Sequence, residues 1–187
     1  MPSSAGRSRA GEIEAGLKLG GAFATVWLDR NVAVEGQSWF EALLARSDGV
    51  DEDVRARALG TASLVAGVRG DYSCVLVWTE EALAHYRAVG AEEGIAWNLT
   101  QLATGALLFG RPEEAAPLLE EAEALHRKLG NDGGLRRVLH VQGQQAVDVG
   151  DLERGRRLMR ESAELHSGSA TSSARRARST RSATSSW

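Results

Sequence analysis

The sequence repeats itself every 40 residues, and this periodicity restricts the fold more than any other feature of the chain. Glycine recurs at Gly70, Gly110 and Gly150, and the segments "TEEALAHYRAVG" and "EEAEALHRKLG" end in one register. The other columns that keep this spacing are Leu19, Leu59, Leu99 and Leu139; Val26, Ala66, Ala106 and Ala146; and Glu41, Glu81, Glu121 and Glu161. A period of this length is typical of arrays in which each repeat packs only against its neighbours.

Each period has the apolar pattern of two amphipathic helices. In the third copy the first helix places apolar side chains three and four residues apart, at Leu99, Leu102, Ala103, Ala106 and Leu107. The second helix repeats that spacing from Ala115 to Ala122. The pattern predicts an all-α fold of about four helix pairs, with helices over 12–28, 34–46, 52–69, 72–88, 94–109, 112–128, 134–149 and 152–166. A buried strand over "CVLVW", residues 74–78, is the alternative.

The turn inside a pair explains the adhesion-type tripeptide Arg69-Gly70-Asp71. Gly70 can adopt the left-handed conformation that ends a helix, and Asp71 can accept a backbone hydrogen bond as the N-cap of the next. The third copy has Gly110-Arg111-Pro112 at the same place. We therefore interpret the tripeptide as a helix end, a turn and a cap rather than as a receptor ligand.

Composition and charge exclude several classes of protein. Residues 1–166 carry 18 basic and 25 acidic side chains, a net charge of −7, which disfavours a nucleic-acid surface. Cys74 is the only cysteine, so cysteine-based zinc sites are excluded, and the N-terminus has no signal-peptide pattern. We expect a cytoplasmic protein with a disordered segment at 1–11, a repeat domain at 12–166 and a disordered Ser/Arg-rich tail at 167–187.

The repeats resemble those of the tetratricopeptide repeat (TPR) family. The resemblance rests on Gly70-Asp71 and Gly150-Asp151, on the small residue seven positions before each turn glycine, and on Ala82 and Ala122 twelve positions after it. It implies a right-handed α-solenoid. Phrases such as "WFEALLAR" and "EEALAHYR" are similar to the repeat region of LuxR-type and SARP ATP-dependent transcriptional regulators of actinobacteria. The chain contains no P-loop and has no room for a helix-turn-helix domain outside the repeats.

The candidate site follows from the same resemblance. In TPR proteins the first helices line a concave groove, and the corresponding residues here are Arg57, Trp97, Thr100, Thr104, Arg137, His140, Gln144 and Asp148. Arginine and tryptophan are frequent binding anchors. The equally weighted alternative is that Trp97 packs against its neighbouring helix and the arginines are solvated. Trp39 and Trp78 are expected in the core.

The sequence predicts an interaction scaffold rather than an enzyme. Its four histidines are dispersed, no catalytic or metal-binding constellation is present, and no cofactor is expected. The predicted function is a sensor or scaffold part of a transcriptional regulator. Its partner would be a protein or peptide, or the ATPase and DNA-binding domains of a parent regulator, with no direct contact to nucleic acid or membrane. The alternative is a truncated or frameshifted fragment without independent activity, because the repeat pattern stops abruptly after residue 166.

Overall fold

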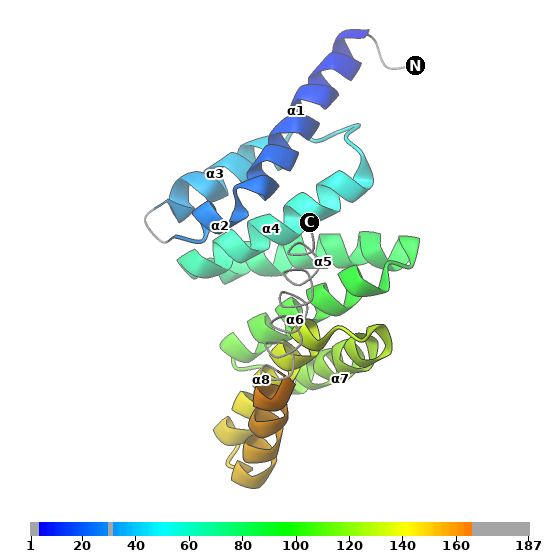
Figure 1. Cartoon of the computed structure of the whole chain (residues 1–187). Coiled ribbons are helices and arrows are strands. Elements are labelled where there is room, and N and C mark those ends of the chain that lie inside the picture. The colour runs from blue at the N-terminus through cyan, green and yellow to red at the C-terminus, as the bar shows by residue number, and fades with distance from the viewer. Residues whose placement is uncertain (1–3, 30–31, 166–187) are drawn as a thin grey trace, which may run out of the picture. The chain divides into compact units, whose positions relative to one another are not determined.

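The computed structural model describes residues 4–29 and 32–165, and every regular element in those ranges is a helix (Figure 1). The helices are α1 (Ser4–Ala22), α2 (Ala24–Trp27), α3 (Ala33–Leu44), α4 (Glu52–Arg69), α5 (Tyr72–Val89), α6 (Glu92–Leu108), α7 (Pro112–Leu129) and α8 (Asp132–Asp148), followed by a helix over 152–165. Residues 74–78 lie inside α5, so the strand alternative is wrong. The predicted all-α class is confirmed. The predicted tail, 167–187, lies outside the described residues.

The chain divides into two compact units, one comprising Met1–Gly105 and the other beginning at Ala106. Buried side chains of the first unit form a core that includes Leu17, Phe40 and Leu59. In the second unit, Leu135 and Leu139 of α8 pack with Leu158 of the last helix. Each unit therefore has an apolar core of its own.

The first copy of the repeat departs from the 40-residue register. Leu59, Leu99 and Leu139 are buried, but Leu19 is 50% exposed, and the buried leucine of α1 is Leu17. In α3 the buried aromatic residue is Phe40, whereas Ala42, in the column of Ala82 and Ala122, is exposed. Both shifts correspond to an offset of 42 residues between the first two copies. The segment between α3 and α4 accounts for it, because Phe40 and Leu59 are two residues further apart than Ala82 and Leu99.

The predicted first helix, 12–28, is also corrected. α1 begins at Ser4, so residues 4–11 are helical although the sequence analysis assigns 1–11 to a disordered segment. This stretch contains no proline, but its two alanines and two arginines are matched by two glycines, so helix propensity alone does not predict the helix. The helix is then interrupted at Phe23, and α2 follows as a single turn.

The turn at Gly70 has the predicted geometry. Gly70 has φ 77°, and the Asp71 amide donates to the Ala66 carbonyl at 3.0 Å, which ends α4 with a left-handed residue. The Asp71 carboxylate accepts from the Cys74 amide at 3.3 Å and from Gln37 Nε2 at 2.9 Å. Arg69 Nη1 donates to Gln37 Oε1 at 2.7 Å. Gly70 therefore ends α4, the Asp71 side chain caps α5, and the Arg69 side chain is hydrogen-bonded to α3.

Replacing Asp71 by alanine should lower the free energy of unfolding by about 1 kcal/mol at neutral pH. The hydrogen bond from Gln37, and then that from the Cys74 amide, lower the pKa of Asp71 below its ordinary value of 3.8. A lowered folded-state pKa means that the stabilisation is present above pH 3.8 and is lost as the pH falls through the folded-state value. Urea unfolding should therefore show a difference between wild type and Asp71→Ala that shrinks in acid. The exposed Asp48→Ala should differ little from wild type at either pH.

An aromatic ring packs against a glycine at each of two contacts between consecutive helix pairs. A Cβ at Gly94 of α6 would lie 2.5 Å from Cγ of Tyr86 in α5. Forty residues later, a Cβ at Gly134 of α8 would overlap the imidazole of His126 in α7, which is buried. The missing side chains let a ring pack directly on the neighbouring backbone, so these two glycines set the spacing between consecutive pairs.

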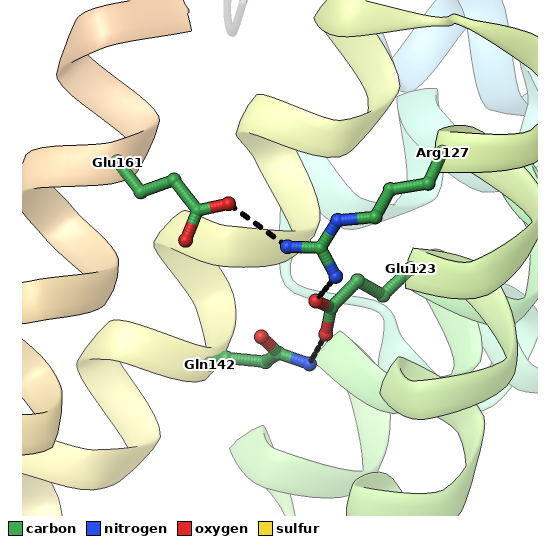
Figure 2. Close-up of polar contacts among 4 residues, drawn as sticks. All are labelled: Glu123, Arg127, Gln142 and Glu161. Carbon is green, nitrogen blue, oxygen red and sulfur yellow. Dashed lines mark hydrogen bonds and ion pairs between the residues drawn. The ribbon is translucent and has the colours of Figure 1, made fainter.

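A polar cluster joins α7, α8 and the last helix in the second unit (Figure 2). Gln142 Nε2 donates to Glu123 Oε2 at 2.7 Å, and Arg127 pairs with Glu123 and, at 2.8 Å, with Glu161. One period earlier, the columns of Gln142 and Glu123 hold Leu102 and Leu83, which are buried and apolar. The second unit therefore has a hydrogen-bonded pair where the preceding copy has two buried leucines.

Candidate ligand-binding surface

A pocket of about 350 Å³ opens between α1 and α4 in the first unit. Its lining residues are Leu17, Lys18 and Gly21 of α1 and Asp53, Val54, Arg57, Ala58 and Thr61 of α4. The volume lies at the lower end of the range of small-ligand pockets. α1 and α4 are the first helices of consecutive pairs, so the pocket lies on the type of helix that the sequence analysis assigns to a binding groove.

Helical spacing brings the lining residues together. Asp53, Arg57 and Thr61 are four residues apart and share one face of α4, with Val54 and Ala58 beside them. On α1, Gly21 lies one turn after Leu17 and leaves open space, since a Cβ built on it would meet no atom within 4 Å. The pocket is thus open at position 21 because Gly21 has no side chain to fill it.

The pocket combines an apolar floor with a charged rim. Arg57 Nη2 lies 2.8 Å from Asp53 Oδ2, and Lys18 Nζ lies 2.6 Å from Glu14 Oε1. His85 Nε2 approaches Asp53 Oδ1 at 3.7 Å from α5. Because both cations of the rim already have acidic neighbours, the rim is not a strong anion site. It suits a ligand that buries an apolar group and leaves polar groups at the mouth.

Asp53 and Arg57 also influence the pKa of Tyr86 in α5. Burial is the main reason why the pKa of Tyr86 is raised above its ordinary value of 10, and the negative charge of Asp53 raises it further, whereas Arg57 lowers it. The Tyr86 phenol therefore stays neutral at physiological pH. His85 contacts the Tyr86 ring edge-on, with centroids 5.5 Å apart.

The predicted residues of α6 are less accessible than a groove requires. Thr100 is 1% exposed and donates its hydroxyl to the Ala96 carbonyl at 2.9 Å. The half-buried Thr104 donates in the same way to the Thr100 carbonyl at 2.8 Å. Trp97 is half-buried. Both hydroxyls thus donate to carbonyls of their own helix. Trp97 has the largest side chain of the three predicted residues on α6.

The predicted residues of α8 share one face of that helix. Arg137, His140, Gln144 and Asp148 follow each other at three- and four-residue spacing, and the last three are exposed. Gln144 Nε2 donates to Asp148 Oδ1 at 3.0 Å. Burial, and then the charge of Arg136, lower the pKa of Arg137. These four residues belong to the second unit and Arg57 belongs to the first, so one continuous groove through all eight predicted residues remains a prediction.

Of the eight predicted residues, only Arg57 lines the pocket. Sequence reasoning missed Lys18 and Gly21 because it aligned α1 with a 40-residue offset instead of 42. With the offset of 42, Leu17 aligns with the buried Leu59, and the exposed side of α1 becomes identifiable. The core assignment of Trp39 is wrong, since it is 42% exposed, whereas Trp78 is half-buried and packs against the core.

Comparisons with known proteins give a limited resemblance. No protein-family model matches the chain. It is 29% identical over 149 residues to proteins named "Putative HTH-type transcriptional regulator" from Mycobacterium bovis and Mycobacterium tuberculosis, which covers 75% of this chain. The chain spans only 17% of the length of those regulators.

A solved structure also aligns with the chain. It is the Podospora anserina "putative kinesin light chain nearly identical TPR-like repeats", with 14% identity, a TM-score of 0.37, and coverage of 83% of this chain and 97% of that one.

Within residues 4–29 and 32–165, no helix has the length and apolar character to cross a membrane. The described part of the chain thus consists of helix pairs, and the chain resembles a segment of mycobacterial transcriptional regulators.

Proposed function

We propose that this chain is an interaction module that binds a segment of a partner protein in the pocket between α1 and α4. The observation that carries the proposal is the pocket itself, with its apolar floor at Leu17, Val54 and Ala58. A floor of this kind accepts an aliphatic or small aromatic side chain, and the charged rim can hydrogen-bond the backbone on either side of it.

We further propose that the module belongs to a transcriptional regulator of the LuxR-type or SARP class and acts there as a sensor or scaffold in the cytoplasm. The resemblance to the mycobacterial regulators supports this placement. The partner segment would then come from another protein or from the ATPase or DNA-binding domain of the parent regulator. A binding module of this kind needs no catalytic group of its own.

The alternative, a truncated array without activity, would leave the apolar outer face of the last helix exposed. In the described part of that helix, 152–165, Leu152 is exposed, and the other long exposed side chains are charged, among them Arg154, Arg156, Arg157 and Arg160. The outer surface of the described part of this helix is therefore mainly charged.

Filling the pocket should weaken binding without disturbing the fold. Gly21→Leu places an aliphatic side chain in the hollow, and a Cβ at Gly21 meets no neighbour within 4 Å. Binders would first be selected on the wild-type chain from a library of short fluorescein-labelled peptides. Fluorescence anisotropy should then show at least roughly tenfold weaker binding to Gly21→Leu, a loss of about 1.4 kcal/mol.

Gly11→Leu is the matched control. Gly11 lies on the same helix, also has no atom within 4 Å of its built Cβ, and does not line the pocket. Both variants should melt at or above the wild-type temperature, because leucine favours a helix more than glycine does. Equal peptide affinities for the two variants would exclude the pocket as the binding site, and so would a library that yields no binder.

A further inference from the structure

An apolar stripe runs along α1 and α2 on a side that no described helix covers. Leu19, Phe23 and Val26 are 50%, 47% and 49% exposed. Their spacing of four and three residues puts them on one helical face, and the backbone bonds from Phe23 N to Leu19 O and from Trp27 N to Phe23 O continue the helix across the break. Three large apolar side chains half exposed in a row are unusual for a surface helix.

The neighbours of α1 occupy its other sides. A Cβ at Gly16 would meet Leu43 of α3, one at Gly20 would meet Phe40 of α3, and the Trp27 ring covers Gly36. α4 lies along the flank of Leu17 and Gly21, where the pocket is. The stripe of Leu19, Phe23 and Val26 is therefore a third flank, distinct from the contacts with α3 and α4.

The later copies show what this flank does inside the array. With the offset of 42, Phe23 corresponds to Val65 of α4, which is 0% exposed, and Val26 to Val68, which packs against the same core. One copy further, the position is Gly105 of α6, where a Cβ would lie 3.1 Å from Leu76 of α5. α5 is the second helix of the preceding pair. The equivalent flank of an inner first helix is thus covered by the second helix before it.

We propose that the stripe of Leu19, Phe23 and Val26 is a docking surface for the second helix of a further TPR-like pair that precedes α1 in a longer parent polypeptide. The occupant must offer aliphatic side chains at the position of Leu76. The regulators that this chain resembles are long enough to supply such a pair, because the match covers 17% of their length.

A second copy of this chain fits the stripe less well. In a head-to-tail arrangement, the helix over 152–165 of one copy would lie on α1 of the next. The position of Leu76 is occupied there by Arg156, with Arg157 and Arg160 also exposed. Burying guanidinium groups against leucine, phenylalanine and valine costs free energy. The chemistry of the stripe therefore favours an apolar helix pair over self-association.

The first test adds a second copy of the α4–α5 helix pair before α1 of the full chain. In this variant, residues 50–91 replace residues 1–9, so that Ala91 precedes Ala10 and the α5 sequence lies in register before α1. The extended chain should melt several degrees higher and bind less of the dye ANS than the wild type. Phe23→Asp should leave the wild-type melting temperature nearly unchanged and remove most of the increase in the extended chain.

A second measurement does not require the extended chain to fold. A synthetic peptide of residues 72–89 should displace ANS from the wild-type chain and should not displace it from Phe23→Asp. The proposal is wrong if neither the extension nor the peptide reduces ANS binding, or if Phe23→Asp has the same effect in both chains. A wild-type dimer in sedimentation velocity that Phe23→Asp dissociates would also overturn it, in favour of self-association. None of these outcomes depends on the peptide pocket between α1 and α4.

Discussion

Leu119→Asp should unfold the second unit, with a loss of more than about 4 kcal/mol in the free energy of unfolding. Leu119 is 1% exposed in the middle of α7, in the column that holds the buried Thr79 one period earlier. Aspartate would remove the apolar contacts of leucine and place a carboxylate where no water reaches it. Far-ultraviolet circular dichroism during heating should show the loss of a large part of the helical signal at a much lower temperature.

Ala124→Asp is the control for this prediction. Ala124 lies on α7 five residues after Leu119 and is exposed, so its aspartate stays hydrated. This variant should lose only the small difference in helix propensity between alanine and aspartate, less than about 1 kcal/mol. Equal melting temperatures for the two variants would show that α7 does not bury the face described above.

Gly134→Ala should destabilise the chain by about 2 kcal/mol, although alanine is the better helix former. The added Cβ would overlap the imidazole of His126, which is buried and has little room to move. The strain exceeds the roughly 1 kcal/mol that alanine gains over glycine within a helix. Urea unfolding monitored by circular dichroism would give the free-energy difference.

The neighbouring glycine provides a matched control. A Cβ at Gly133 would meet only Asn131 Oδ1, at an ordinary 3.6 Å, so Gly133→Ala should be neutral or slightly stabilising. If the clash with His126 is the cause, adding His126→Ser to Gly134→Ala should cost less than the sum of the two single changes. Additive effects, or a stable Gly134→Ala, would contradict the role of this glycine in spacing the helix pairs.

Local signals in the sequence were sufficient to predict most of the helices from Glu52 onward. α4 and α5 meet at Gly70 and Asp71, and both residues have the conformations that their types favour. The columns of Leu59 and Ala66 also remain buried in every later copy. Each of these predictions depends only on a few neighbouring residues, so it can be made from the sequence pattern alone.

The first copy could not be placed by the same reasoning. It has no turn glycine, because Arg30 stands at that position with an offset of 40 and Leu28 with an offset of 42. The segment from Phe40 to Leu59 is also two residues longer than the segment from Ala82 to Leu99. A shift of two residues turns a helix by about 200°. That rotation moves Leu19 and Trp39 out of the core and brings Leu17 and Phe40 into it. Only the packing of α1 against α3 and α4 determines the correct register.

The candidate site was predictable only in part for the same reason. Arg57 belongs to a copy whose register is correct, and it lines the pocket as expected of a first-helix residue. Lys18 and Gly21 belong to the shifted copy, and the hollow depends on an absent side chain. Thr100 and Thr104 have the right spacing, but threonine in a helix can donate to the carbonyl four residues before it, and both do so.

Binding of a partner segment between α1 and α4 can be tested by a nuclear magnetic resonance titration of the ¹⁵N-labelled full chain with the tightest peptide from the library. If the peptide binds in the pocket, the amide shifts should change first around Leu17–Gly21 and Asp53–Thr61, and Gly21→Leu should strongly reduce these changes at the same peptide concentration. Shift changes confined to the exposed face of α8, or none at saturating peptide, would contradict it.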